Sequence, residues 1–246
     1  MFDRESTVNA DRYPPIPALP VVFEDDALLV VNKPSGMLSQ PGKSMDGSVL
    51  TRVLGSGRAL HGPVLVHRLD MDTSGLLLLA KTREVHRALQ QQFERRQVRK
   101  RYQARLECPV IALGGRIHLP IRLDVDDRPR QIVCFKHGKA STTLWHKSSS
   151  VDPFAVTFYP LTGRTHQLRV HAASFAGLGS AIACDRLYGT ANKPEKTLTE
   201  DSCMREKRLM LHADYLQFEH PLLHRPQSVH CPANFQIDSS LTLEHT

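Results

Sequence analysis

Residues 64–80 read Val-Leu-Val-His-Arg-Leu-Asp-Met-Asp-Thr-Ser-Gly-Leu-Leu-Leu-Leu-Ala. The apolar runs at 64–66 and 75–80 predict two buried strands, and the polar residues between them predict a loop at the strand ends. Loops held on a rigid scaffold often carry the chemistry of a protein. This segment therefore predicts both part of the core and a candidate site.

The rest of the chain predicts further strands separated by polar turns. These strands are expected at 21–23, 27–31, 101–107, 154–161, 208–219 and 228–235, with others inside 114–145. Few helices intervene between them. This order favours an α+β fold with a mixed, largely antiparallel sheet and flanking helices.

Two helices are predicted from apolar residues that recur at helical spacing. The first is expected from Thr82, a good N-cap residue, to about residue 97. The second is expected at about 166–176, where Leu168, Ala172 and Phe175 would share one face.

The positive charge of the chain is concentrated in one stretch. The 246 residues contain 32 Lys+Arg and 25 Asp+Glu, a formal net charge of +7. Residues 81–105, here called the basic stripe, hold nine of these cations and two of the acids. The remainder of the chain is therefore balanced. A local stripe of this kind favours an anionic partner, most often nucleic acid; the alternative is a solvated helix face.

Composition also suggests the domain organisation and the compartment. Four prolines in residues 1–20 predict an extended arm, followed by one domain at 21–235 with a flexible polar insertion at 190–207 and a tail at 236–246. The five cysteines form no CxxC pair, which favours a reducing cytoplasm and mostly buried, inert thiols. The polar start predicts no secretory signal, and no apolar run approaches the roughly 20 residues that span a bilayer.

Asp70 is the candidate reactive group of the polar loop. A carboxylate can act as nucleophile or general base without a cofactor, although it can also be a simple turn or ion-pair residue. To stay ionised in a dry pocket it needs a guanidinium, for which Arg68, Arg164 and Arg169 are candidates. Residues 70–73 also weakly imitate the DxDxT loop of haloacid-dehalogenase-type phosphatases, in which two Asp hold Mg²⁺.

Five motifs, in order along the chain, resemble those of the RluA-type RNA pseudouridine synthases. They are an NKPxG loop at 32–36, HRLDxxTSGL at 67–76, K-x-Y at 100–102, the TGRxHQxR-VH helix at 162–171 and LHA at 211–213. The segment 128–139 further resembles the small RluA subgroup, which lacks an S4 domain. The resemblance covers about residues 21–235 and implies the pseudouridine synthase catalytic fold.

The resemblance implies an enzyme that isomerises uridine in RNA to pseudouridine. The N1–C1′ bond breaks, the uracil rotates, and C5 bonds to C1′, with no metal, nucleotide or redox cofactor. The implied substrates are stem-loops of 23S rRNA, of tRNA or of both. The protein is expected to be cytoplasmic and, because no dimer face is readable, monomeric.

The resemblance also implies roles for individual residues. Asp70 would be the essential carboxylate, which either attacks C1′ or removes the 2′ proton. Arg169 would pair with Asp70, Tyr102 would stack on the uracil, and Leu211 would line the pocket. Because a stacked base must be extruded to be reached, Arg68 would fill the gap that it leaves. The RNA-binding candidates are Arg68, Arg95, Arg99, Arg101, Arg128, Arg130 and Lys139.

Each of these roles has an alternative. Tyr102 and Leu211 could be core residues, Arg169 a helix-surface charge, and Arg68 the partner of Asp72 in an ion pair. The whole protein could be an RNA-binding or assembly factor without turnover. It could also be a hydrolase of sugars or phosphates, which would need a second positioned carboxylate or a metal.

Overall fold

A computed structural model describes residues 19–42, 47–62, 64–148, 152–189 and 208–235. The expected arm (apart from residues 19 and 20), insertion and tail lie outside the described residues. Within the described part of the chain, no helix is long and apolar enough to cross a membrane.

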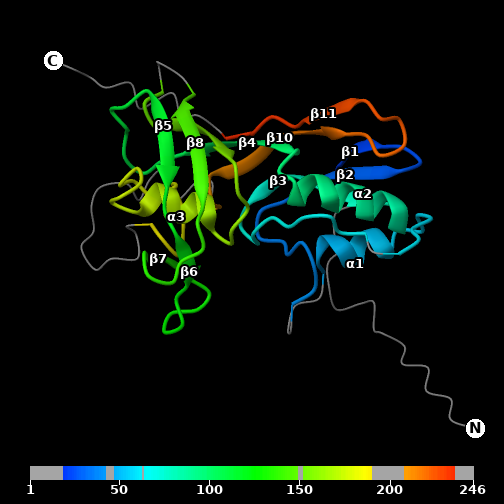
Figure 1. The fold of residues 1–246 in the computed structure, drawn as a ribbon, viewed down its shortest axis with the longest axis horizontal. Coiled ribbons are helices and arrows are strands. Elements are labelled where there is room, and N and C mark those ends of the chain that lie inside the picture. The colour runs from blue at the N-terminus through cyan, green and yellow to red at the C-terminus, as the bar shows by residue number, and fades with distance from the viewer. Residues whose placement is uncertain (1–18, 43–46, 63, 149–151, 190–207, 236–246) are drawn as a thin grey trace, which may run out of the picture.

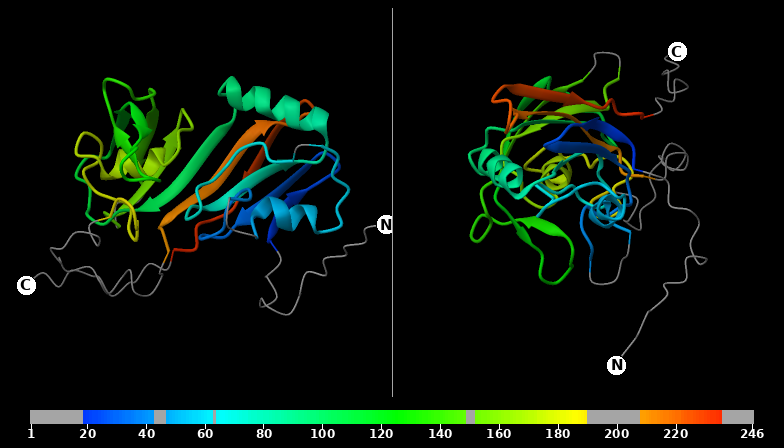
Figure 2. Two further views of the ribbon diagram at one scale, coloured as in Figure 1. Left: turned by 90° about the horizontal axis from the view of Figure 1, so that it is seen from below. Right: turned by 90° about the vertical axis from the view of Figure 1, so that its right-hand side faces the viewer.

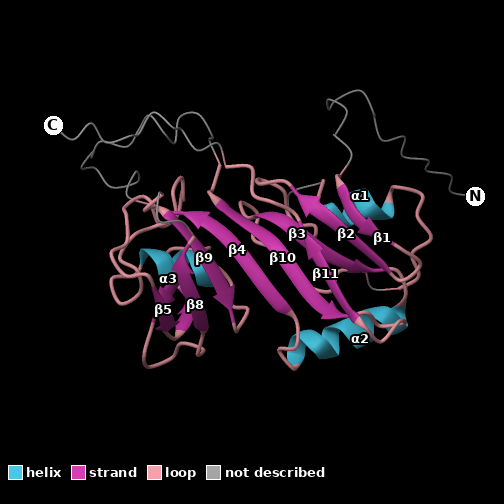
Figure 3. Cartoon of the chain, turned by 90° about the horizontal axis from the view of Figure 1, so that it is seen from above, coloured by secondary structure: helices cyan, strands magenta, loops and turns pink. Residues whose placement is uncertain are grey.

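One nine-stranded sheet runs the length of the molecule (Figure 3). Its strands follow the order β1-β2-β3-β10-β4-β9-β8-β5, and β11 pairs with β10. Only β3 and β10 pair in parallel, so the predicted α+β fold with a largely antiparallel sheet is confirmed. These strands are β1 Val21–Glu24, β2 Leu28–Lys33, β3 Ser74–Ala80, β4 Arg99–Arg105, β5 Gly114–His118, β8 Thr142–Lys147, β9 Ala155–Pro160, β10 Leu211–Glu219 and β11 Pro226–His230.

A separate hairpin and three helices complete the described fold. The hairpin pairs β6 Ile121–Leu123 with β7 Gln131–Val133 and lies below α3 in Figure 1. The helices are α1 Val49–Leu54, α2 Arg83–Glu94 and α3 Gln167–Ala173. Thr82 caps α2 as predicted, because its hydroxyl accepts a hydrogen bond from Val85 N.

The strand β3 is buried along its whole length because helices cover both of its faces. Leu76 and Leu78 pack in a core cluster with the α2 residues Val85 and Leu89. Leu77 and Leu79 point the other way and pack in a second cluster with α1. The left view of Figure 2 shows α2 and α1 on either side of these strands. Two-sided burial explains why the sequence here is a continuous apolar run rather than an alternation.

Several predicted element ends were wrong. Residues 64–66 form no strand; only Leu65 makes an isolated bridge, and its carbonyl also contacts His86 Nε2 at 3.1 Å. The helix α2 stops at Glu94, because Arg96 takes a left-handed conformation with φ 58°. The helix α3 ends at Ala173 because Ser174 is extended, which leaves Phe175 99% exposed rather than on the buried face.

The prediction of mostly buried thiols was also wrong for the described cysteines. Cys108 is exposed, and Cys134, Cys184 and Cys231 are half-buried. No disulfide joins any two of these four cysteines.

Gly75 allows the parallel contact between β3 and β10. Its φ is +113°, and it pairs with Ala213. A Cβ atom at Gly75 would lie only 2.6 Å from Ala213 N and would overlap its carbonyl oxygen. No other residue type fits this position without moving one strand.

We expect Gly75→Ala to lower the free energy of unfolding by at least about 3 kcal/mol, because backbone strain and a clash with backbone add together. Gly57→Ala is the matched control, since Gly57 has φ +73° but nothing within 4 Å of a Cβ. It should cost about 1 kcal/mol, the conformational penalty alone. Urea unfolding of both variants measures the difference, and equal costs would contradict the close approach.

Candidate active site

The loop that carries Asp70 is fixed by a buried lysine at the end of β2. Lys33 has no exposed surface, and its Nζ donates to the carbonyls of Pro34 (2.9 Å), Met37 (2.6 Å) and Met71 (2.8 Å). Burial lowers the pKa of Lys33 to about 7, while the negative charges of Asp70 and Asp72 act in the opposite direction. Three carbonyl acceptors match the three donors of the protonated amine.

Further hydrogen bonds join the same two loops. Ser35 Oγ donates to Asp72 O at 2.6 Å, and Gly36 N donates to Met71 O at 2.9 Å. Ser39 Oγ donates to Leu69 O at 2.8 Å and accepts from Leu69 N at 3.0 Å. The backbone on both sides of Asp70 is therefore held in place.

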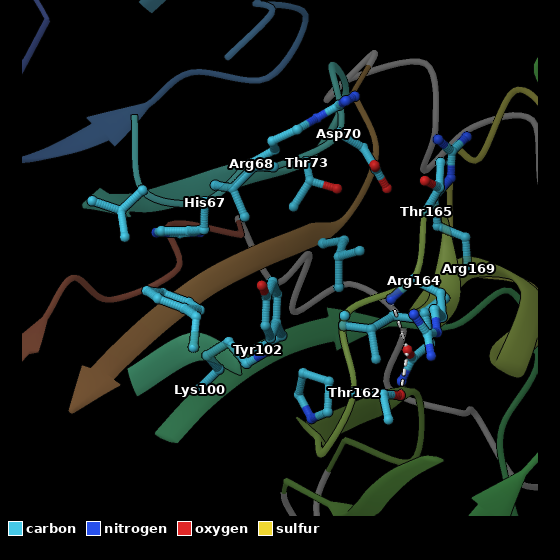
Figure 4. A pocket seen from close by; sticks show the side chains of 18 of the residues that line it. His67, Arg68, Asp70, Thr73, Lys100, Tyr102, Thr162, Arg164, Thr165 and Arg169 are labelled. Atoms are coloured by element: carbon cyan, nitrogen blue, oxygen red, sulfur yellow. Dashed lines mark hydrogen bonds between the residues drawn. The ribbon is translucent and has the colours of Figure 1, made fainter. Parts of the chain in front are cut away.

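Asp70 opens onto a cavity of about 490 Å³ (Figure 4). This volume lies within the range of roughly 300–1,000 Å³ that small-molecule sites occupy. The cavity is also lined by Tyr102 from β4, Arg169 from α3 and Leu211 from β10. Four parts of the chain thus bring the four predicted catalytic and supporting residues to one pocket.

Tyr102 lies in the middle of the pocket (Figure 4) and also packs against two core clusters. Burial raises the pKa of its phenol, and the charge of Asp70 raises it further. The side chain is therefore a protonated phenol, with an aromatic face that can stack on a base and a hydroxyl that can donate.

Arg169 corrects one prediction, because its ion-pair partner is Asp185 and not Asp70. Its Nε and Nη2 donate to the Asp185 carboxylate at 2.8 and 2.6 Å. Both side chains are almost wholly buried, so Arg169 is not a helix-surface charge. The charges of Asp185 and then Asp70 raise the pKa of Arg169 against the effect of burial. Asp70 therefore interacts with a fixed cation that another carboxylate holds.

His67 lines the pocket and was missed as a site residue. Its Nε2 accepts a hydrogen bond from Leu78 N at 3.0 Å, and its ring stacks on Phe93 with centroids 4.9 Å apart. Burial lowers its pKa to about 3, so the ring is neutral. The HRLD order could have suggested this, since its other members face the same pocket.

Lys100 is the second pocket residue that the predictions left out. It lines the cavity close to Tyr102, and no hydrogen bond or ion pair joins it to the described part of the chain. Burial lowers its pKa. The K-x-Y pattern was the available signal, because residues two apart in a strand point to one face.

The predicted RNA-binding residues differ in their surroundings. Arg68, Arg95, Arg99, Arg128 and Lys139 are exposed, and none of the described residues pairs with Arg68 in an ion pair, so the alternative pairing with Asp72 is not found. Arg130 pairs with Asp127 at 3.1 Å. Arg101 is held by the buried Asp214 at 2.7 Å and lies over the Tyr215 ring. Its guanidinium therefore has a structural partner.

Comparison with known proteins shows the family of the chain. Residues 27–174 match the family model described as RNA pseudouridylate synthase. The chain belongs to the RNA pseudouridylate synthase family. As a member it is an isomerase that acts on RNA and converts uridine to pseudouridine.

Several relatives of this pseudouridine synthase are named dual-specificity RNA pseudouridine synthase RluA. The protein from Vibrio parahaemolyticus is 39% identical over 90% of this chain and 86% of its own length. That from Escherichia coli K12 is 37% identical over 90% of this chain and 96% of its own. Among solved structures, human RNA pseudouridylate synthase domain containing 1 has a TM-score of 0.70 and 27% identity, covering 87% of this chain and 83% of that one.

The described part of this synthase contains no group of three or more His, Cys, Asp or Glu side chains that could hold a metal ion. The cavity is lined by two carboxylates, those of Asp70 and Glu94, by the phenol of Tyr102, and by four cationic side chains, those of Arg68, Lys100, Arg164 and Arg169.

We expect Asp185→Asn to lower the free energy of unfolding of the synthase by about 3–5 kcal/mol, because it leaves the buried Arg169 without a counter-charge. Asp127→Asn is the matched control. It breaks the exposed Arg130–Asp127 pair, with side chains 36% and 61% exposed, and should cost less than about 1 kcal/mol. Chemical denaturation of both variants checks this, and similar small losses would contradict a structural Arg169–Asp185 pair.

Proposed function

We propose that Asp70 is the catalytic carboxylate of this pseudouridine synthase. The observation that carries the proposal is the convergence of Asp70, Tyr102 and Arg169 on one cavity from three separate elements. The hydrogen bonds of Lys33 and Ser39 fix the backbone on both sides of Asp70, which limits where its carboxylate can lie. The buried guanidinium of Arg169 interacts electrostatically with Asp70 across the cavity.

In this proposal the target uridine enters the cavity with its base against Tyr102. The aromatic face stacks on the uracil, and Leu211 forms the apolar wall. Asp70 then acts at the ribose, either by attack on C1′ or by removal of the 2′ proton, and both routes remain open. Tyr102 stays protonated because its pKa is raised, so its hydroxyl can donate a hydrogen bond to the bound uracil.

The base reaches the cavity by extrusion from the RNA stack. Extrusion costs a few kcal/mol and is easiest in loops, where bases can be splayed out. Arg68 is exposed, lines the rim of the cavity and is two residues from Asp70. Its planar guanidinium is suited to stack and hydrogen-bond in the space that the base leaves.

The RNA backbone is proposed to follow the basic residues next to the cavity. A second cavity of about 690 Å³ adjoins the first and is lined by Arg96, Arg99 and Arg164. Arg99 supplies exposed charge here and Arg95 is exposed at the end of α2, whereas Arg101 is held by Asp214. Arg128 and Arg130 in the β6–β7 hairpin, and Lys139, which bridges to Ile121 of β6, form the second proposed contact.

The proposed substrates are stem-loops of 23S rRNA, of tRNA or of both. The relatives named dual-specificity synthases support action on more than one RNA. We further propose that residues 21–235 form one catalytic domain, flanked by an arm and a tail, and that the protein works as a monomer in the cytoplasm.

The central test is Asp70→Asn, which should abolish pseudouridine formation while RNA binding survives, because only the reactive oxygen is lost. Asp72→Asn is the matched control from the same loop and should keep activity. Pseudouridine in rRNA and tRNA transcripts is mapped after incubation with each variant, and binding is measured by filter retention.

The outcomes also separate the alternatives. If Asp70→Asn keeps wild-type activity, the proposed catalytic role is wrong. A phosphatase with two Mg²⁺-binding Asp would lose its activity in the Asp72→Asn variant too and would require added Mg²⁺. A wild-type protein that binds RNA but forms no pseudouridine would instead favour an assembly factor.

We expect RNA affinity to fall steeply with salt, because cations that bind phosphates displace counterions. Arg95→Ala combined with Arg99→Ala should flatten the slope of log affinity against log salt by roughly one to two units. The control pair Arg83→Ala and Arg225→Ala removes two exposed charges, one at the far end of α2 and one in the β10–β11 turn, and should leave the slope unchanged. Equal slopes in both double variants would exclude the proposed contact.

A further inference from the structure

Tyr188 lies between the β6–β7 hairpin and the active site. Its hydroxyl accepts a hydrogen bond from Gln131 N, the first residue of β7, at 2.8 Å. The same oxygen is 2.8 Å from His166 Nδ1. A phenol has one proton to donate, and donation to His166 gives every one of these groups a partner.

The protonation state of His166 follows from this arrangement. Burial lowers the pKa of His166, so the ring is neutral and carries one proton. Because Nδ1 accepts from Tyr188, that proton is on Nε2. Burial raises the pKa of Tyr188 to about 12, so its hydroxyl remains a donor at physiological pH.

The ring of Tyr188 makes a second link, to Arg169. Its centroid is 5.2 Å from Arg169 Cζ, a cation–π distance. Asp185, which holds Arg169, also accepts from Leu187 N and Tyr188 N at 2.9 and 3.1 Å. The turn at residues 185–188 therefore supplies both the carboxylate that pairs with Arg169 and the aromatic ring that covers its guanidinium. From the hairpin, Arg130 Cζ is 5.9 Å from the same ring.

We propose that Tyr188 is a positioning residue of the active site: its hydroxyl joins the β6–β7 hairpin to His166, while its ring holds the guanidinium of Arg169. The pseudouridine synthase reaction rests on Asp70, and Tyr188 acts on it only through Arg169 and His166. The inference rests on the proposed function, because it assumes that Asp70 and Arg169 serve catalysis.

Tyr188→Phe keeps the ring and removes the hydroxyl. It should lower the single-turnover rate constant at saturating RNA by about tenfold to a hundredfold, since small misplacements of supporting groups have effects of this size. The RNA dissociation constant should stay within about threefold. Tyr215→Phe is the matched control, because Tyr215 also lies 5.2 Å from an arginine Cζ and bonds through its hydroxyl, to Ser228. It should change neither quantity.

A rate constant within about twofold of the wild type, or a loss confined to the dissociation constant, would overturn the proposal. Melting curves show that each variant is folded at the assay temperature, so lost stability is not mistaken for lost positioning. If the wild type itself forms no pseudouridine, the proposed function fails. NMR and amide exchange then still test whether the Tyr188 hydroxyl bonds His166 and Gln131.

Two measurements do not depend on activity. ¹⁵N NMR of the wild type should show His166 with a bare Nδ1 and a protonated Nε2, assigned by comparison with His166→Gln; a protonated Nδ1 would contradict the proposal. Amide hydrogen exchange of Gln131 should accelerate at least tenfold in Tyr188→Phe, while that of Val133 stays unchanged. Unchanged exchange at Gln131 would show that the hydroxyl does not hold the hairpin.

Discussion

The active site depends on one close backbone contact, that of Gly75 with Ala213. Ala213 pairs with Gly75 of β3 on one side and with Tyr102 of β4 on the other. The contact therefore sets how far the loop before β3 lies from the phenol on β4. Leu211 reaches the same pocket two residues earlier on β10. A wider spacing between β3 and β10 would separate the carboxylate from the aromatic ring on which the base is proposed to stack.

The site also contains buried cationic side chains, and their surroundings differ. Lys33 is satisfied by three carbonyls, and Arg169 by a carboxylate and the face of Tyr188. Lys100 faces the cavity with no partner in the described structure. Anionic groups that enter this pocket thus meet fixed positive charge that needs little reorganisation, as preorganised electrostatic stabilisation requires.

The sequence predicted the elements that local patterns encode and missed those that depend on distant contacts. The apolar run of β3 and the Thr82 cap are local signals, and both were confirmed. The partner of Arg169 could not be predicted, because Asp185 lies in an irregular turn without periodicity and was one carboxylate among many. Phe175 shares the spacing of Leu168, but the helix ends before it, so spacing alone gave the wrong face.

The two-sided covering of β3 has a consequence for how the molecule loses its structure. Hydrogen bonds in a strand sealed by α1 on one face and α2 on the other break only in openings close to complete unfolding. The loop with Asp70 is attached directly to this strand, so partial openings that release the edge strands β1 and β5 leave the Asp70 carboxylate in place. On heating, catalysis should persist until the whole domain melts.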